Sequence, residues 1–299
     1  MRITVTGASG FIGRRLIRQL DADNHELHIL GRGLRTGFAP SIRFSNWDAL
    51  AGTPPTASLD GADAVIHLAG EPVAQRWSLD VKRRIRDSRV DGTRRLVEAL
   101  AHCSRRPAAL VGASAVGLYG ERGDETLTED SAPGSGFLAD VCREWENELD
   151  AARSLGMRVV KLRIGVVLGA EGGALARMLP PFRMGVGGRL GAGDQWMSWI
   201  HAEDLAALIR FAVAEGALSG AVNAVAPNPA RNAEFTTALS RALRRPALLP
   251  VPLFAIRLLF GEMSEIVLAS QKVLPRAAEA AGYRFRFPEV FPALKDLLG

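Results

Sequence analysis

Close to its start the chain carries the stretch Ile3-Thr4-Val5-Thr6-Gly7-Ala8-Ser9-Gly10-Phe11-Ile12-Gly13, in which an apolar strand runs into three regularly spaced glycines. Glycine meets a different need at each position. Gly7 turns the chain sharply off the strand, Gly10 lets the backbone approach a pyrophosphate, and Gly13 lets the following helix pack against the strand. The first amides of that helix then point at the phosphates. The stretch therefore predicts a dinucleotide-binding turn.

The residues around this turn supply the strand-helix-strand context that makes a glycine motif informative. Apolar residues recur at helical spacing from Phe11 to Leu20, and a second strand is expected over Glu26 to Leu30. A tight turn that binds no ligand is the alternative. In this context the sequence favours a nucleotide site.

The end of the second expected strand indicates which dinucleotide binds. An NAD site needs a carboxylate there for the ribose 2′-hydroxyl, whereas an arginine suits the 2′-phosphate of NADP. The chain reads Leu30-Gly31-Arg32-Gly33, with Arg35 just beyond and no carboxylate. We therefore predict NADP(H) as the cofactor, with Gly31 and Arg32 among its contacts. The alternative is that Arg32 is only a solvated loop residue.

Length and composition narrow the class of protein. With 299 residues and 47% apolar content, the chain is long enough for one large α/β domain and a smaller lobe. No apolar run is long enough to span a bilayer, and the first residues read as a strand rather than a secretion signal. Cys103 and Cys142 are too few for a disulfide framework and lack metal-ligand spacing. We expect no metal site and a reducing, cytoplasmic setting.

The net charge of +5 raises the question of a nucleic-acid partner. The arginines are dispersed, and only Lys82-Arg83-Arg84-Ile85-Arg86 is dense. No aromatic platform or helix-turn-helix pattern accompanies this run, so a solvated helix face is favoured. We expect a small-molecule substrate as the partner, and neither nucleic acid nor a membrane.

Strands and helices alternate along the chain, which predicts an α/β fold with a Rossmann-type doubly wound parallel sheet. Beyond the first unit, strands are expected over 64–70, 108–112 and 158–164, and helices over 79–102 and 137–155. After Ile200 the pattern predicts a helix over 202–215, a short strand over 222–224, a helix over 232–243 and short helices punctuated by prolines.

These elements predict three parts of the chain. An NADP-binding Rossmann domain is expected over 1–168, and part of 198–225 returns to it. A substrate loop, or lid, is expected over 169–198. A smaller C-terminal α/β lobe that contributes to the substrate site is expected over 226–299.

Several motifs together carry a family resemblance over essentially the whole chain. They are the glycine motif, Leu68-Ala69-Gly70, Asp91-Gly92-Thr93, Ser114 with Tyr119-Gly120, Arg163, and Ile200-His201-Ala202-Glu203-Asp204-Leu205-Ala206. With them the chain resembles an extended short-chain dehydrogenase/reductase of the NAD-dependent epimerase/dehydratase family. Further motifs make it most similar to a subgroup of uncharacterised epimerase-like proteins, described as sugar-nucleotide epimerases, with a C-terminal domain of unknown function. These are Ala69-Gly70-Glu71-Pro72, Cys142-Arg143-Glu144-Trp145-Glu146, Met178-Leu179-Pro180-Pro181-Phe182-Arg183, Gly185-Val186-Gly187-Gly188 and Ser270-Gln271-Lys272-Val273-Leu274-Pro275.

The resemblance implies an acid/base unit that this chain lacks. In active members a Tyr and a Lys four residues apart on one helix, beside a Ser or Thr, move a proton as the hydride transfers. Ser114 fills the Ser position, but Phe137 and Val141 stand at the expected Tyr and Lys positions. Phenylalanine has no proton to give and valine has no charge, so this helix cannot supply the usual proton transfer.

Tyr119 is the candidate for the missing proton donor, because it follows Ser114 beyond a strand end that faces the cofactor in this architecture. The catalytic prediction is therefore Ser114 and Tyr119. Relatives often carry a Tyr in this loop without using it as the base, which is the alternative. Asp140 and His201 are weaker candidates, and Asp204 is expected to cap or anchor a helix.

Further cofactor contacts are expected by position. Leu68, Ala69 and Gly70 end a strand, where small side chains let the adenosine side of the cofactor lie against the backbone. Arg89 either reaches a phosphate or carboxamide oxygen or is a charge on a helix surface. Val167 follows another strand and is expected near the nicotinamide.

The loop over 168–198 is where the resembled family binds substrate. Its length and glycine content predict a mobile lid, and Arg183 and Arg189 within it suit an anionic substrate.

Two functions stay open. One is an NADP(H)-dependent oxidoreductase or epimerase that acts on a small, nucleotide-sugar-like substrate without the usual Tyr and Lys. The other is a catalytically silent NADP(H)-binding sensor or regulatory protein. The resemblance also implies a homodimer, in which the helices over 79–102 and 137–155 pair across a two-fold axis.

Overall fold

The structure, a computed structural model, describes residues 1–33, 37–247 and 249–299. Seven parallel strands form the central sheet: β1 (Arg2–Thr6), β2 (Glu26–Gly31), β3 (Arg43–Asn46), β4 (Ala64–His67), β5 (Ala109–Ala115), β7 (Arg158–Ile164) and β11 (Gly220–Ala224). Their order is β11-β7-β5-β4-β1-β2-β3. The winding direction reverses between β1 and β4, which opens a crevice at the carboxyl ends of these strands. The predicted doubly wound parallel sheet is confirmed, although β3 was not predicted.

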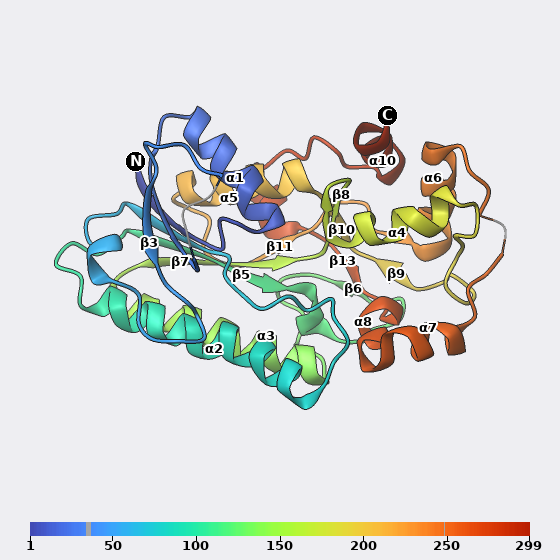
Figure 1. Cartoon of the computed structure of the whole chain (residues 1–299), viewed down its shortest axis with the longest axis horizontal. Helices are drawn as coiled ribbons and strands as arrows, with labels where there is room; N and C mark the ends of the chain where they lie inside the picture. Colours follow the sequence, from blue (N-terminus) through green and yellow to red (C-terminus); the bar gives the residue numbers. More distant parts are fainter. Residues whose placement is uncertain (34–36, 248) are drawn as a thin grey trace.

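Four long helices cover the two faces of the sheet (Figure 1). They are α1 (Phe11–Ala22) and α5 (Ala202–Ala214) on one face, and α2 (Leu79–Ala101) and α3 (Phe137–Asp150) on the other. A 3-10 helix over Ala151–Leu155 continues α3 to the predicted end of that helix. Each face has its own apolar core, as the helical spacing of apolar residues predicted. Within the described ranges, no helix combines the length and the apolar character that crossing a bilayer requires.

A second lobe is built on the carboxyl edge of the sheet (Figure 1). Its helices are α4 (Gly173–Arg183), α6 (Asn232–Leu243), α7 (Leu253–Phe260), α8 (Ser264–Leu268) and α10 (Val290–Leu298), and α9 (Arg276–Ala280) packs beside β11. Three two-stranded sheets join the parts: β8 (Val166–Gly169) with β10 (Trp199–His201), β9 (Trp196–Met197) with β12 (Ala230–Arg231), and β6 (Thr126–Leu127) with β13 (Lys272–Val273). A separate apolar core fills this lobe.

The prediction of a loop over 169–198 was wrong for residues 173–183, which form α4. Leu175, Leu179 and Phe182 are buried on one face of this helix, in the core that α6 and α10 share. Their helical spacing is a signal for a helix. Pro180 and Pro181 lie inside the helix and, with the many nearby glycines, they obscured that signal.

Asp204 joins the two lobes. It lies in the first turn of α5, is 2% exposed, and accepts hydrogen bonds from the backbone N–H groups of Arg286 at 2.8 Å and Phe287 at 2.9 Å. The Tyr283 hydroxyl donates to the Asp204 carbonyl oxygen at 2.8 Å. Asp204 therefore anchors the C-terminal segment to the Rossmann domain.

Replacing Asp204 by alanine should lower the free energy of unfolding by about 2–4 kcal/mol, because one buried and one part-buried backbone N–H group lose their acceptor. Urea unfolding followed by circular dichroism measures the loss. Asp21→Ala, an exposed position of α1, is the control and should change stability by less than about 0.5 kcal/mol. Equal stability of the two variants would contradict the anchoring role.

Candidate functional site

The glycine turn has the geometry that the sequence predicted. Gly7 has a φ of +70°, and a Cβ there would lie 2.6 Å from the Leu68 carbonyl carbon. A Cβ on Gly13 would lie 2.3 Å from the Gly7 carbonyl oxygen. Ser9 and Gly10 are exposed, and no described side chain caps the start of α1. The free amides of this helix therefore suit an anion such as a pyrophosphate.

A buried polar network holds this turn against β4. The Thr6 hydroxyl lies 2.7 Å from His67 Nδ1 and accepts from the Leu68 and Ala69 N–H groups at 3.2 Å each. His67 Nε2 lies 3.1 Å from the Thr93 hydroxyl. Burial, together with the positive charge of Arg89, lowers the pKa of His67 to about 4. His67 is neutral at pH 7, and the sequence reading missed its role because the two threonines are distant along the chain.

Arg32 follows β2 directly and is exposed. Gly31, which ends β2, is half-buried beside the Phe44 ring. The guanidinium of Arg32 therefore stands at the strand end where the ribose of a dinucleotide lies in this fold. Arg35 lies outside the described residues.

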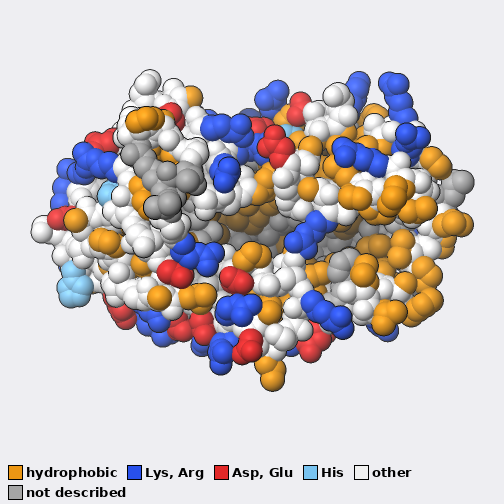
Figure 2. Space-filling model, viewed as in Figure 1, with side chains coloured by type: hydrophobic (Ala, Val, Ile, Leu, Met, Phe, Trp, Pro, Cys, Tyr) orange, Lys and Arg blue, Asp and Glu red, His pale blue; other side chains and the backbone are white. Residues whose placement is uncertain are grey.

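A cavity of about 640 Å³ lies between the two lobes and is open to solvent. Figure 2 shows the corresponding hollow near the centre of the molecule. Its lining includes three sets of residues. They come from the strand ends (Leu68, Ala69, Gly70, Ala113, Ser114, Ala115), from α2 and α3 (Arg89, Phe137, Leu138, Ala139, Val141, Cys142, Trp145), and from the C-terminal lobe (Arg257, Ser264, Glu265, Ile266, Leu268). Most of these side chains are apolar.

Arg89 places a positive charge in the cavity wall. Its Nη1 donates to the carbonyl oxygens of Glu71 and Ile85 at 3.0 Å each, and its guanidinium stacks on the Trp145 ring at 5.2 Å. A Cβ on Gly70 would lie 3.2 Å from the guanidinium carbon. Burial lowers the pKa of Arg89, which nevertheless stays charged at pH 7. The remaining donors of this side chain can serve an anionic or carbonyl group in the cavity.

Arg183 and Arg189, which the sequence suggested for an anionic substrate, do not line this cavity. Both are exposed on the outer surface of the C-terminal lobe. Arg89 and Arg257 are the arginines of the cavity wall instead.

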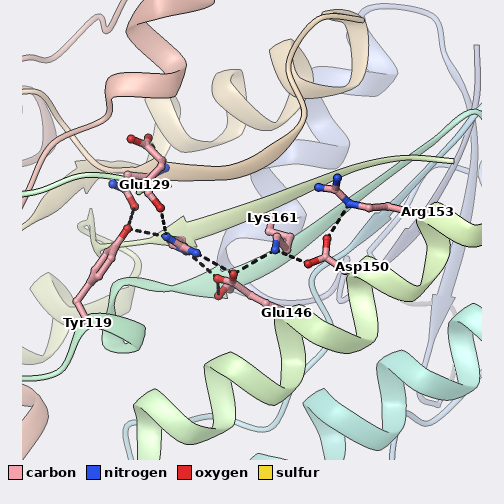
Figure 3. Close-up of polar contacts among 9 residues, drawn as sticks. Tyr119, Glu129, Glu146, Asp150, Arg153 and Lys161 are labelled. Carbon is pink, nitrogen blue, oxygen red and sulfur yellow. Dashed lines mark hydrogen bonds and ion pairs between the residues drawn. The ribbon is translucent and has the colours of Figure 1, made fainter. Parts of the chain in front are cut away.

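Ser114 belongs to a buried charged network behind the cavity wall. Its Oγ donates to Glu146 Oε1 at 2.8 Å. The same carboxylate accepts from Arg163 Nε at 2.8 Å and Arg163 Nη2 at 3.0 Å, and Lys161 Nζ lies 3.4 Å away. Figure 3 shows Glu146 at the centre of this chain of contacts. The network fixes the Ser114 side chain at the edge of the cavity.

Tyr119 belongs to the same network but not to the cavity lining. Its hydroxyl lies 2.7 Å from Asn223 Oδ1 and 2.9 Å from the Thr128 carbonyl oxygen, and accepts from Arg163 Nη1 at 2.9 Å. The residue is fully buried, and burial raises the pKa of its hydroxyl. These contacts argue against Tyr119 as the proton donor, because its hydroxyl already has three partners within the protein (Figure 3).

The two departures from the family pattern do face the cavity. Phe137 and Val141 both line it, as the resemblance places the Tyr and Lys of active members. The Phe137 ring packs edge-on against Trp77 with a centroid distance of 5.1 Å. The two weaker candidates lie elsewhere: Asp140 is exposed and paired with Arg143, and His201 is buried outside the cavity lining.

Val167, which the sequence predicted near the nicotinamide, does not line the cavity. Ile164, Gly165 and Val166 line the cavity, whereas Val167 packs against the apolar core of the Rossmann domain. The contact of Val167 with the nicotinamide stays a prediction.

Comparison with known proteins is consistent with this geometry. The model described as the NAD dependent epimerase/dehydratase family matches residues 3–224, and a domain of unknown function, DUF1731, matches residues 251–297. The chain is 42% identical over 302 residues to the chloroplastic epimerase family protein SDR39U1 homolog of Arabidopsis thaliana, covering 100% of this chain and 87% of that protein. It is 38% identical over 299 residues to the epimerase family protein YfhF of Bacillus subtilis, covering 100% and 98%.

A solved structure is similar over the full length. The human epimerase family protein SDR39U1, crystallised with NADPH, matches with a TM-score of 0.89 at 36% identity, over 100% of this chain and 99% of that chain. The match includes the second lobe as well as the Rossmann domain.

The neutral state of His67 predicts a loss of stability in mild acid. Its pKa is lowered from 6.5 to about 4 in the fold, so between these values the unfolded chain binds a proton that the folded chain excludes. About 3 kcal/mol of stability, present above pH 6.5, should be lost as pH falls to about 4. Urea unfolding at a series of pH values measures this loss. In His67→Asn the fall should shrink by that amount, and an unchanged fall would contradict the assignment.

Proposed function

The chain belongs to the NAD dependent epimerase/dehydratase family, and from this premise we propose that it is an NADP(H)-dependent oxidoreductase or epimerase for a small molecule. The observation that carries the proposal is the cavity itself. The strand ends of the Rossmann sheet, with the Ser114 side chain, and residues of the C-terminal lobe line the same cavity. Such a cavity is the usual form of a substrate site in this architecture.

The chain's own residues suit NADP(H). The uncapped start of α1, from Ser9 to Gly13, would hold the pyrophosphate, and Arg32 would pair with the 2′-phosphate. Leu68, Ala69 and Gly70 would lie along the adenosine side, and Arg89 would reach an anionic or carbonyl oxygen. The human relative crystallised with NADPH supports this choice. When bound, the nicotinamide supplies or accepts a hydride.

We assign the proton transfer to Ser114 backed by Glu146. Ser114 Oγ donates its own proton to Glu146 at 2.8 Å, and a lone pair of this oxygen can accept the proton of a substrate hydroxyl. As the substrate carbon loses a hydride, its hydroxyl proton passes to Oγ and the Ser114 proton passes to the carboxylate. Reduction of a carbonyl reverses these two transfers. Ser114 touches the substrate, and Glu146 acts through it.

The second candidate function is an NADP(H)-binding sensor without turnover. The observation that favours it is the presence of Phe137 and Val141 in the cavity wall, where neither residue can move a proton. Nicotinamide absorbance separates the two functions when the protein is mixed with NADPH or NADP⁺ and fractionated cell metabolites. A fraction that changes the absorbance with the wild type but not with Ser114→Ala supports the enzyme. Tight NADPH binding without turnover in any fraction supports the sensor.

The cofactor assignment predicts that NADPH binds at least about tenfold more tightly than NADH, because Arg32 forms charge-assisted hydrogen bonds with a dianionic phosphate. Titration calorimetry on the wild type and Arg32→Ala measures both affinities. The variant should lose the preference while keeping its affinity for NADH. Equal affinities in the wild type would refute the choice of NADP(H).

The proton assignment predicts that Ser114→Ala and Glu146→Gln each slow the single-turnover rate by about 10²- to 10⁴-fold. Both should leave the affinity for NADPH within about threefold of the wild type, because neither residue is placed on the cofactor. Glu144→Gln, two residues away on the surface of α3, is the matched control. A full rate in Glu146→Gln would remove Glu146 from the proton path.

A further inference from the structure

Large apolar side chains are exposed along α7 and beside it. Phe254 is 73% and Leu258 is 78% exposed, although such residues are normally buried in a soluble domain. We call the exposed set on this surface the apolar patch. It consists of Met184, Val186, Leu249, Leu253, Phe254, Leu258, Leu259 and Ile266.

Backbone contacts make the patch continuous. The segment after α4 runs alongside the segment before α7, with Gly191 N–H donating to the Val251 carbonyl oxygen at 2.9 Å and Val251 N–H donating to the Arg189 carbonyl oxygen at 2.7 Å. A Cβ on Gly185 would lie 3.8 Å from the Pro246 ring. Met184 and Val186 therefore lie next to the chain that leads into α7. Figure 2 shows hydrophobic side chains gathered at this end of the molecule.

The surface around the patch is strongly basic. Residues 183–193 and 241–261 contain six arginines and no Asp or Glu. The arginines are all exposed: Arg183, Arg189, Arg241, Arg244, Arg245 and Arg257. Within the described ranges, none of them forms an ion pair. The neighbouring carboxylates along the chain are Asp194, which is exposed, Glu262, which pairs with Lys82, and Glu265, which lines the cavity.

From this combination of an apolar patch and an unpaired arginine rim, and contrary to the expectation from the sequence that no membrane is a partner, we propose that α7 docks the protein on the surface of an anionic lipid bilayer. Leu and Phe side chains enter the interface while arginines meet the phosphates of the headgroups. A second copy of the chain suits the surface less well. A two-fold contact would bring two arginine rims together with no carboxylate in these segments to pair with them.

The docking surface borders the opening of the cavity. Arg257 belongs to the arginine rim and Ile266 to the patch, and both also line the cavity. Docking through α7 therefore places the cavity opening at the lipid surface. The docking needs neither cofactor nor turnover, so its test is independent of the proposed function.

Co-sedimentation of the full chain with vesicles tests the proposal. The protein should bind phosphatidylcholine vesicles that contain about 30% phosphatidylglycerol, bind pure phosphatidylcholine vesicles at least about tenfold more weakly, and detach as salt rises. The double variant Phe254→Ser, Leu258→Ser should bind anionic vesicles about a hundredfold more weakly. Each apolar side chain that is replaced should lower the affinity for the vesicles about tenfold. The double variant Arg244→Ser, Arg245→Ser should bind anionic vesicles at least about tenfold more weakly than the wild type.

Leu79→Ser is the matched control, because Leu79 is 87% exposed at the start of α2, outside the patch. It should bind vesicles like the wild type, and unfolding curves should show that all variants fold. Absence of binding to anionic vesicles at low salt would overturn the proposal, as would unchanged binding by the Phe254 and Leu258 variant. A wild-type dimer in light scattering that this variant splits would show that a second copy covers the patch, which also overturns it.

Discussion

The ion pair between Glu146 and Arg163 joins α3 to β7 directly behind the cavity wall, with both side chains at least nine-tenths buried. Removing charges from water is costly, and it is tolerated only when hydrogen bonds satisfy both partners. Here Arg163 donates to Glu146, to Tyr119 and to the Glu129 carbonyl oxygen, and the carboxylate raises the pKa of its guanidinium. Loss of one partner would strand a buried charge at a cost of about 3–5 kcal/mol.

This pair separates the roles of two residues that look alike in the sequence. Ser114 lies at the end of β5 and Tyr119 follows this strand closely, and both touch the network, but they touch it from different sides. Ser114 reaches Glu146 from the cavity, whereas the Tyr119 hydroxyl meets Arg163, Asn223 and Thr128 inside the protein. The same charges that orient Ser114 thus hold Tyr119 away from a ligand. A hydroxyl group alone does not indicate which of these positions it takes.

The parts predicted well from the sequence depend on local patterns. The glycines after β1 are required by sterics within a few residues, and the helices over the sheet follow from the spacing of their apolar residues. The parts predicted poorly depend on contacts between distant segments. The pairing of Ser114 with Glu146 joins residues 32 positions apart, and the packing of Val167 against the core of the Rossmann domain likewise depends on distant segments. In α4, proline and glycine hid the helical spacing of the apolar residues from sequence-based prediction. This helix is stabilised by packing against distant parts of the chain, which the local sequence does not show.

The two lobes that enclose the cavity are joined by contacts of unequal strength. On the side of α5, the buried Asp204 side chain accepts hydrogen bonds from two backbone N–H groups, and such contacts are costly to break. On the side of α7 and α8, Lys82 pairs with Glu262, whose side chain is largely exposed, and a pair of that kind contributes about 1 kcal/mol or less. Of these two links, the contact of Asp204 therefore holds the C-terminal lobe to the Rossmann domain more firmly. The segment that follows α8 adds further hydrogen bonds, because the Ser270 N–H donates to Glu121 Oε2 at 2.6 Å and the Ser270 hydroxyl donates to the Gly123 carbonyl oxygen at 2.7 Å.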